Sequence, residues 1–390
     1  MTRTTDREGV DVDHMVEVML QLLSTPSPSG RTDQIIQHIG DRLDDAGLSP
    51  KLTRRGALRV SLGDDGSSSG ARTVLAHADT IGAMVSGLKA NGRLEIVPVG
   101  THSARFAEGA RVTVFTDDLE VTYSGTVMPL KASGHRYGDE IDTQGVGWDH
   151  VELRIDEPVA SEDDVRALGI EVGDHVSFDP QPVVTQNGYV VSRHLDDKAG
   201  LAALLTAARD LAPEADSLPT PMHLLVTISE EVGHGASHGV DATVAEMVSI
   251  DNAVVAPGQA SSEHCVTVAM QDLHGPFDYH LSRHLLSLCD GLGIGHRRDV
   301  FRYYRSDVAA AVESGSQSRA ALVGAGIDGS HGYERTHLDA LVGLVKLIKA
   351  YARSPLVFSD WNPQPEGPLE EFPSTSVQPA PELPDSRDER

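Results

Sequence analysis

The sequence predicts an α/β protein with a doubly wound sheet, interrupted by an inserted small β-barrel domain. Apolar strand-like runs alternate with helical segments at both ends of the chain, whereas the stretch between them shows short alternating segments and little helical periodicity. The length of 390 residues suggests two or three domains. We expect a discontinuous α/β domain in residues 1–83 and 187–358, an inserted β-barrel in 84–186, and a disordered acidic, proline-rich tail in 359–390.

The first part of the α/β domain is predicted to contain two helices and a buried strand. A helix is expected from Val12 to Leu23, where Met15, Met19 and Leu22 share a stripe. A breaker cluster over residues 24–30 separates it from a second helix, which shows three- and four-residue spacing of Ile35, Ile36, Ile39 and Leu43. The apolar run from Thr73 to Ala76 then predicts a strand that ends in the motif HADTIG.

The middle of the chain is predicted to form the barrel, because short alternating segments are separated there by Gly, Asp and Pro. The expected strands are Arg111–Phe115, Glu120–Tyr123, His150–Ile155 and His175–Phe178.

The last part of the α/β domain returns to alternating helices and strands. Strands are expected at Met222–Ile228 and Met247–Ile250. Helical stripes are formed by two sets of residues: Leu201, Leu204, Leu205, Ala208 and Leu211, then Leu338, Leu341, Val342, Val345 and Ile348. Before the last helix, Thr336 and Asp339 have capping-box spacing, which predicts that His337 lies in the first helical turn while His331 stays on a glycine-flanked loop.

Composition excludes several classes of function. With 32 Lys and Arg against 58 Asp and Glu, the net charge of −26 disfavours binding to nucleic acids and to anionic membrane surfaces. The N-terminus lacks the apolar segment of a signal peptide, and the two cysteines form no C-x-x-C pair, so we expect a cytoplasmic protein without disulfides. Eighteen histidines in an acidic chain point instead to metal ligands, because His and carboxylate bind the same metals.

Metal-type side chains follow the ends of several predicted strands, where ligands gather in open α/β sheets. They are His77 with Asp79, Glu230 with Glu231, Asp251, the pair Asp196–Asp197 before a helix, and His331 on its loop. Each feature has a plain alternative: a helix cap for Asp197, a solvated loop for the glutamates, and a turn for Asp251. Together they suit two metals that share a carboxylate, with the spare glutamate as general base.

At these residues the chain resembles the glutamyl and deblocking aminopeptidases, metallopeptidase family 42. HADTIG, LDDKAG, SEEVGHG, SIDNA and the late loop histidine carry the resemblance, and GTHSARFAEGARVTVF and GIEVGDHVSFDP resemble the family's inserted dimerisation domain. The resemblance to this family covers roughly Met15 to Ala352. The chain is also similar to a branch associated with a small blocked glutamine-dipeptide osmolyte. It departs from the family at Lys198, where many members have Arg, and at GSHGYER, where H-S-P is usual.

The resemblance implies the sheet of a co-catalytic dinuclear-metal exopeptidase and a role for each residue. The implied metal ligands are His77, Asp196 as the bridge, Glu231, Asp251 and His331. Glu230 is implied as the base, Asp79 as the residue that orients His77, and Asp307 as part of the substrate pocket. The implied cofactors are two divalent metal ions per subunit, zinc or cobalt first and manganese third. The implied substrate is a small peptide or dipeptide-like molecule, and the implied assembly is a dimer-built homo-oligomer such as a dodecamer.

Two rival functions stay open. A deacylase, carboxypeptidase or amidase that acts on N-acyl amino acids or dipeptides would use the same chemistry on another bond. A non-catalytic peptide-binding or assembly protein could keep the scaffold, but the intact Glu230 beside five intact ligands argues against it.

Overall fold

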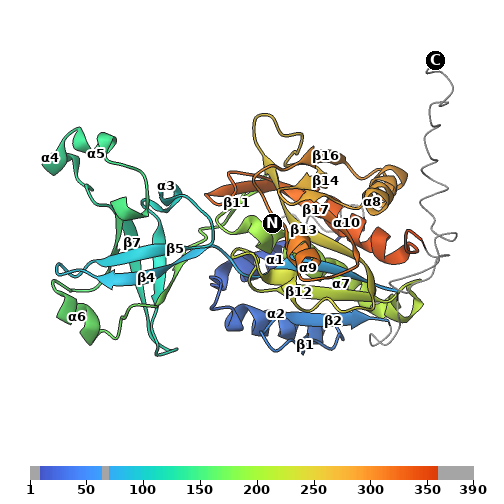
Figure 1. The fold of residues 1–390 in the computed structure, drawn as a ribbon, viewed down its shortest axis with the longest axis horizontal. Coiled ribbons are helices and arrows are strands. Elements are labelled where there is room, and N and C mark those ends of the chain that lie inside the picture. Colours follow the sequence, from blue (N-terminus) through green and yellow to red (C-terminus); the bar gives the residue numbers. More distant parts are fainter. Residues whose placement is uncertain (1–8, 64–69, 359–390) are drawn as a thin grey trace, which may run out of the picture.

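A computed structural model describes residues 9–63 and 70–358. Figure 1 shows two bodies, a barrel on the left and a larger α/β body on the right that holds both ends of the described chain. This confirms the predicted α/β fold with an inserted barrel. The tail expected to be disordered, 359–390, lies outside the described residues.

Within the described residues, twelve strands form one mixed sheet. The central strands β12, β3, β13 and β17 are parallel, and antiparallel strands extend the sheet on both sides. Along the sheet the order is β1 (Lys51–Leu52), β2 (Leu58–Leu62), β12 (Met222–Thr227), β3 (Ala71–His77), β13 (Val244–Val255), β17 (Arg319–Asp328), β18 (Glu334–His337), β11 (Tyr189–Ser192) and β10 (Val183–Val184). β14 (Val266–Asp272) pairs with β17, β15 (Gly275–Pro276) and β16 (His296–Val300).

Helix α7 (Leu195–Leu211) lies at the centre of the α/β body. It packs against α1 (Val12–Ser24), α10 (Leu338–Arg353) and the parallel strands β3, β13 and β17. We predicted one apolar stripe on this helix, but nearly all of its residues are buried. Small and apolar residues on every face explain this, because a helix that is apolar all round belongs in a core. The remaining helices of this body are α2 (Asp33–Asp45), α8 (Tyr279–Leu292) and α9 (Asp307–Glu313).

The prediction for the start of α10 was wrong. His337, not Thr336, is the N-cap, and its side chain accepts the backbone N–H of Asp339. The Thr336 hydroxyl instead donates to the carbonyl of Gly326 on β17, because Thr336 belongs to strand β18. No helix among the described residues combines the length and the apolar character needed to cross a membrane.

The barrel is closed by six antiparallel strands around its own core. Inward-facing residues alternate along each strand, as Val112 and Val114 do on β6 and Leu153 and Ile155 on β8. In order around the barrel the strands are β4 (Gly82–Leu88), β5 (Leu94–Val99), β8 (Val151–Ile155), β7 (Thr122–Pro129), β6 (Arg111–Phe115) and β9 (His175–Phe178). Its short helices are α3 (Ala104–Ala107), α4 (Gly134–Tyr137), α5 (Glu140–Thr143) and α6 (Glu162–Ala167).

For two barrel strands the predicted first residue lies before the first residue of the strand in the structure. Glu120 lies in a turn, where its N–H donates to the Asp118 carboxylate, so β7 begins at Thr122. His150 ends a 3₁₀ turn before β8 begins at Val151. The division of the chain at 84 and 186 stays a prediction; the barrel strands begin at Gly82, end at Phe178, and are followed by β10 of the large sheet.

Candidate metal centre

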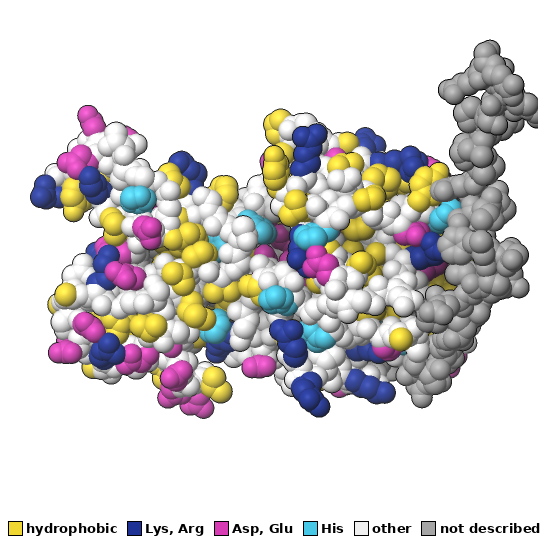
Figure 2. All heavy atoms as spheres, viewed as in Figure 1, with side chains coloured by type: hydrophobic (Ala, Val, Ile, Leu, Met, Phe, Trp, Pro, Cys, Tyr) yellow, Lys and Arg dark blue, Asp and Glu magenta, His cyan; other side chains and the backbone are white. Residues whose placement is uncertain are grey.

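The candidate metal centre lies at one edge of the parallel strands, where the barrel meets the α/β body. Figure 2 shows histidine side chains along the middle of this face, between the two bodies. His77 ends β3, and Thr227, the last residue of β12, is its register partner. Glu230 and Glu231 follow three and four residues later. Because parallel strands end at the same edge, residues far apart in sequence meet here.

Asp251 reaches this edge differently from the prediction. We expected it after a strand that ends at Ile250, but β13 continues to Val255. The strand continues because β17 pairs with it as far as Val255, whereas its pairing with β3 stops at Ser249. Asp251 therefore lies just past the last residue that pairs with β3.

Asp196 lies between the two histidines. Its Oδ1 is 3.1 Å from Nε2 of His77, and its Oδ2 is 3.2 Å from Nε2 of His331. The Asp196–Asp197 peptide bond is cis. Burial opposes the charge of Asp196, but the hydrogen bonds from His331 and His77 outweigh it and lower the pKa of this carboxyl. Asp196 is thus an ionised carboxylate that faces both sides of the site.

His331 stands on its loop with a left-handed backbone, at φ 63°. Its Nδ1 donates to the carbonyl of Thr101, in the segment after β5 of the barrel, at 2.7 Å. Its Nε2 faces Asp196 and lies 3.5 Å from Oε2 of Glu231. Burial lowers the pKa of His331, but the hydrogen bond to Asp196 and the charges of Glu231 and Asp196 raise it to about 10. The carboxylates around Nε2 therefore favour a positive charge at this point of the site.

The ring of His77 is hydrogen-bonded to the backbone of Asp79 through Nδ1. Its Nδ1 donates to the backbone carbonyl of Asp79 at 2.8 Å, whereas the Asp79 carboxylate oxygen is 3.7 Å away. That carboxylate instead accepts the Ser29 hydroxyl and the backbone N–H groups of Glu230 and Glu231. Asp79 therefore holds the histidine and the glutamate pair in place together.

The two adjacent glutamates differ in their surroundings: Glu231 lies near His331, whereas Asp251 is the charge that acts most strongly on Glu230. Glu231 accepts the N–H of Ile81 through Oε1 and turns Oε2 toward His331. Burial, and then the charge of Asp251, raise the pKa of Glu230 well above its usual value. Burial also raises the pKa of Glu231, to about 7.

Two buried residues of the site were missed by sequence reasoning. Glu334, at the start of β18, accepts the N–H of His331 at 2.9 Å and the N–H of Asp196 at 3.1 Å. Asn252 donates from its amide to Oδ2 of Asp196 at 2.5 Å. Asn252 follows Asp251 directly in the motif SIDNA, which was the one available signal; nothing in the sequence marks Glu334.

Other expected residues lie beside the centre. Asp197 accepts the N–H of Gly200, which agrees with the helix-cap alternative. Asp307 is buried at the start of α9, where its carboxylate accepts the Thr227 hydroxyl and the N–H of Ala236. Burial raises the pKa of Asp307 to about 6. Its place in a substrate pocket stays a prediction. Lys198, the departure from the family's Arg, donates to the carbonyl of Thr25.

These residues fit divalent cations. Their ligand atoms form two close groups that share one residue: His77, Asp196 and Asp251, then Asp196, Glu231 and His331. Asp251 is only 2% exposed, and its Oδ2 has no hydrogen bond of standard geometry among the described residues, although the Tyr304 hydroxyl lies near this carboxylate. A buried carboxylate oxygen without a partner is costly unless a cation offsets its charge. Imidazole and carboxylate are ligands for zinc and neighbouring transition metals.

Comparisons with known proteins agree with this geometry. The chain is 37% identical over 343 residues to YhfE of Bacillus subtilis, a candidate aminopeptidase by name; the match covers 88% of this chain and 98% of that protein. It is 26% identical to the lysyl aminopeptidase of Pyrococcus furiosus, over 56% of this chain and 60% of that one. A solved structure of the Pyrococcus horikoshii TET1 peptidase superposes with a TM-score of 0.76 and 25% identity, and covers 87% of this chain and 99% of its own.

The model of one family matches residues 56–347. With that match over most of the chain, and with the relative YhfE aligned over nearly its whole length, the protein belongs to the M42 glutamyl aminopeptidase family and is a metal-dependent aminopeptidase.

Proposed function

We propose that the protein is a dinuclear metal aminopeptidase that removes N-terminal residues from small peptides. The observation that carries this proposal is the pair of ligand groups that share Asp196. On this proposal His77 and Asp251 would hold one divalent ion, Glu231 and His331 would hold the other, and Asp196 would contribute to both. The His and carboxylate ligand set favours zinc or cobalt, with manganese as the third candidate.

The ions supply Lewis acidity, which polarises a peptide carbonyl and acidifies water. The chain supplies the proton transfers. Glu230 takes a proton from the attacking water onto its carboxylate and returns it to the leaving amine. Burial raises the pKa of Glu230, which makes its carboxylate a stronger base toward the attacking water. Asp79 positions this base by accepting its backbone N–H at 3.1 Å.

The two glutamates provide the test of this mechanism. Glu230→Gln should keep the fold and the metal but lose about 10²–10⁴-fold in turnover, which is typical of a lost general base. Glu231→Gln should lose metal as well, and thermal stability with it, because bound metal stabilises the folded state. Metal content, melting temperature and rate should be measured on both variants. Loss of metal from Glu230→Gln alone would mean that the roles are exchanged, and full activity in both would refute the site.

The substrate class needs a second measurement. We propose that the cleaved peptide carries a free α-amine, as the aminopeptidase family implies. Matched di- and tripeptides with free, acylated and amidated ends should be compared in the presence of zinc, cobalt and manganese. Faster cleavage of the acylated series would favour the deacylase alternative over this proposal.

The assembly is also a proposal. The Pyrococcus horikoshii TET1 peptidase is described as able to assemble into a tetrahedron or a large octahedral shell. We propose that this chain forms a dimer-built homo-oligomer through its barrel, with a dodecamer as the expected size. Sedimentation of the full chain as a monomer would contradict this.

A further inference from the structure

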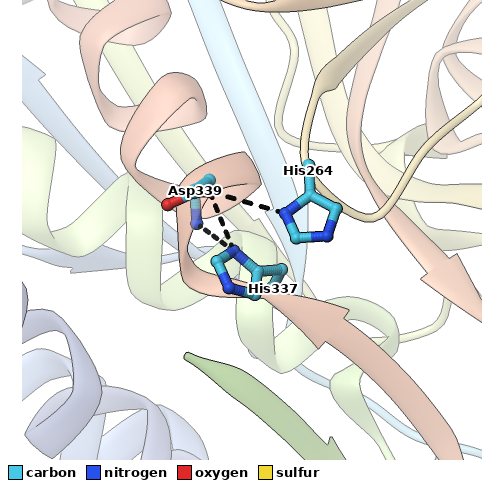
Figure 3. Close-up of side chains that lie close together, drawn as sticks. All are labelled: His264, His337 and Asp339. Carbon is cyan, nitrogen blue, oxygen red and sulfur yellow. Dashed lines mark hydrogen bonds and ion pairs between the residues drawn. The ribbon is translucent and has the colours of Figure 1, made fainter. Parts of the chain in front are cut away.

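A second group of metal-type side chains lies outside the catalytic centre. It consists of His264, which precedes β14, His337 at the end of β18, and Asp339 in the first turn of α10 (Figure 3). Figure 3 shows the two imidazole rings next to each other, with dashed lines from both rings to Asp339; the ring centroids are 4.2 Å apart. One ligand atom from each residue lies within 4.8 Å of the other two. We propose that these three side chains form a separate zinc-binding site.

The distances fit the size of a zinc ion. Nδ1 of His337 is 3.1 Å from Oδ2 of Asp339, and Nδ1 of His264 is 3.4 Å from the same oxygen. Ligands about 2.0–2.2 Å from a tetrahedral zinc are separated by about 3.3–3.6 Å. The ligand atoms of the two histidines lie within 4.8 Å of each other, so the two rings must also turn toward a shared point for all three atoms to reach bonding distance. Two histidines and one carboxylate leave the fourth position of a tetrahedral zinc to water.

The proton positions favour binding through Nδ1. Nε2 of His337 lies 2.8 Å from the carbonyl of Asn187, an oxygen that only accepts, so Nε2 carries the proton. Nδ1 of the neutral ring then has a lone pair, which accepts the Asp339 N–H at 3.1 Å. That N–H belongs to the first turn of a helix, where backbone N–H groups have no acceptor within the helix. Water can replace the ring nitrogen as its acceptor when the lone pair binds zinc.

His264 is oriented in a similar way. Its Nε2 lies 3.1 Å from the hydroxyl of Tyr189, whose oxygen can accept a hydrogen bond from Nε2–H when Nδ1 binds metal. The neighbouring Glu263 is held to β18 by two hydrogen bonds from Arg335, at 2.7 and 3.0 Å. Outer contacts of this kind fix the ring orientation of metal-binding histidines. Arg335 is itself paired with Glu263, so its positive charge is largely neutralised near the site.

The site is open to solvent on one side. The side chains of His264 and Asp339 are 45% and 48% exposed, whereas that of His337 is 8% exposed. Zinc can therefore enter without unfolding. Once bound, it joins the segment before β14 to the start of α10 and should stabilise that junction.

The test is a zinc count on the full-length protein. Wild type, His264→Ala and Asp339→Asn should be dialysed against buffered zinc at a concentration that saturates the wild type. Wild type should hold one zinc per chain more than either variant. Loss of one outer partner costs about 10–100-fold in metal affinity, so loss of a ligand should weaken this site by about 100-fold or more.

His274→Ala is the matched control, because His274 is an exposed histidine that pairs with one carboxylate, Glu313, at 2.9 Å. It should keep the full zinc count. A second readout is the melting temperature, which zinc should raise further in the wild type than in His264→Ala. Equal zinc counts in the wild type and both site variants would overturn the proposal, as would the same loss in the His274 control. Peptide hydrolysis should be unchanged in His264→Ala, which separates this site from the catalytic one.

Discussion

Glu334 connects the two sides of the catalytic metal centre through the backbone. Its carboxylate accepts the N–H of His331 through Oε1 and the N–H of Asp196 through Oε2. The change Glu334→Gln keeps the shape of the side chain but replaces one oxygen with an NH₂ group that faces an N–H donor. One hydrogen bond is lost, so either Asp196 or His331 must move.

The charge of Glu334 determines how strongly Glu334→Gln weakens metal binding. Burial and the charge of Asp196 raise its pKa to about 8 in the metal-free protein, which disfavours the ionised form of this carboxyl. A cation at Asp196 offsets that charge and favours the ionised form. Glutamine should therefore weaken mainly the metal-bound state, by about 1.5–3 kcal/mol for one hydrogen bond to a charged group. This corresponds to about 10–100-fold in metal affinity.

Competition for zinc with a fluorescent chelator measures that affinity. Glu246→Gln is the control, because Glu246 and Glu334 are each 2% exposed. Glu246 also accepts two hydrogen bonds, from the Tyr351 hydroxyl at 2.8 Å and the Val357 N–H at 2.6 Å. The control should melt at a lower temperature with unchanged zinc affinity. A folded Glu334→Gln protein that binds zinc as tightly as the wild type would refute the reasoning.

Three further predictions follow from the same contacts. His331→Ala should lower the rate of peptide hydrolysis, whereas His337→Ala should keep the rate and lose about 0.5–2 kcal/mol of stability with its helix cap; hydrolysis rates and thermal unfolding distinguish them. In chelated protein the pKa is raised to about 7 for Glu231 and about 10 for His331, so between about pH 4.5 and 7 these groups hold extra protons in the folded state and their contribution to stability should fall; above pH 7 the buried Lys198, whose pKa is lowered to about 7, opposes the remaining fall from His331. Added zinc should reverse the fall, and equal melting temperatures of chelated protein at about pH 4.5 and 7 would contradict it. Replacing 84–186 with a short linker should reduce the sedimenting assembly and weaken metal binding, because His331 loses the Thr101 carbonyl.

The positions of the metal-type residues could be predicted because strand ends were recognisable. An apolar run such as Thr73–Ala76 marks a buried strand, and in a parallel sheet the residues after several such runs must meet at one edge. His77, Asp251 and the glutamate pair follow this rule. Asp251 was misplaced only in relation to its strand, because the length of β13 is set by its pairing with β17 and not by its own residues.

The contacts that orient the ligands could not be predicted, because they depend on backbone groups. The carbonyl of Asp79 holds His77, and the carbonyl of Thr101 holds His331. Every residue has a carbonyl, so no residue type marks these two. The capping error at Thr336 has the same origin, since its hydroxyl found a carbonyl on the neighbouring strand.

Strand β18 shows why local motifs miss such connections. The first residue of β18, Glu334, accepts the N–H of Asp196, which lies 138 residues earlier in the chain. The last residue of β18, His337, lies against the Asp339 carboxylate. The same carboxylate faces His264, which lies 75 residues before Asp339. Three residues of extended chain span about 10 Å, so one short strand reaches both clusters. Pairing of β18 with β11 fixes the positions of both ends. A substitution that breaks this pairing should therefore disturb zinc binding at both places, whereas a change in the side chain of His264 should disturb only one.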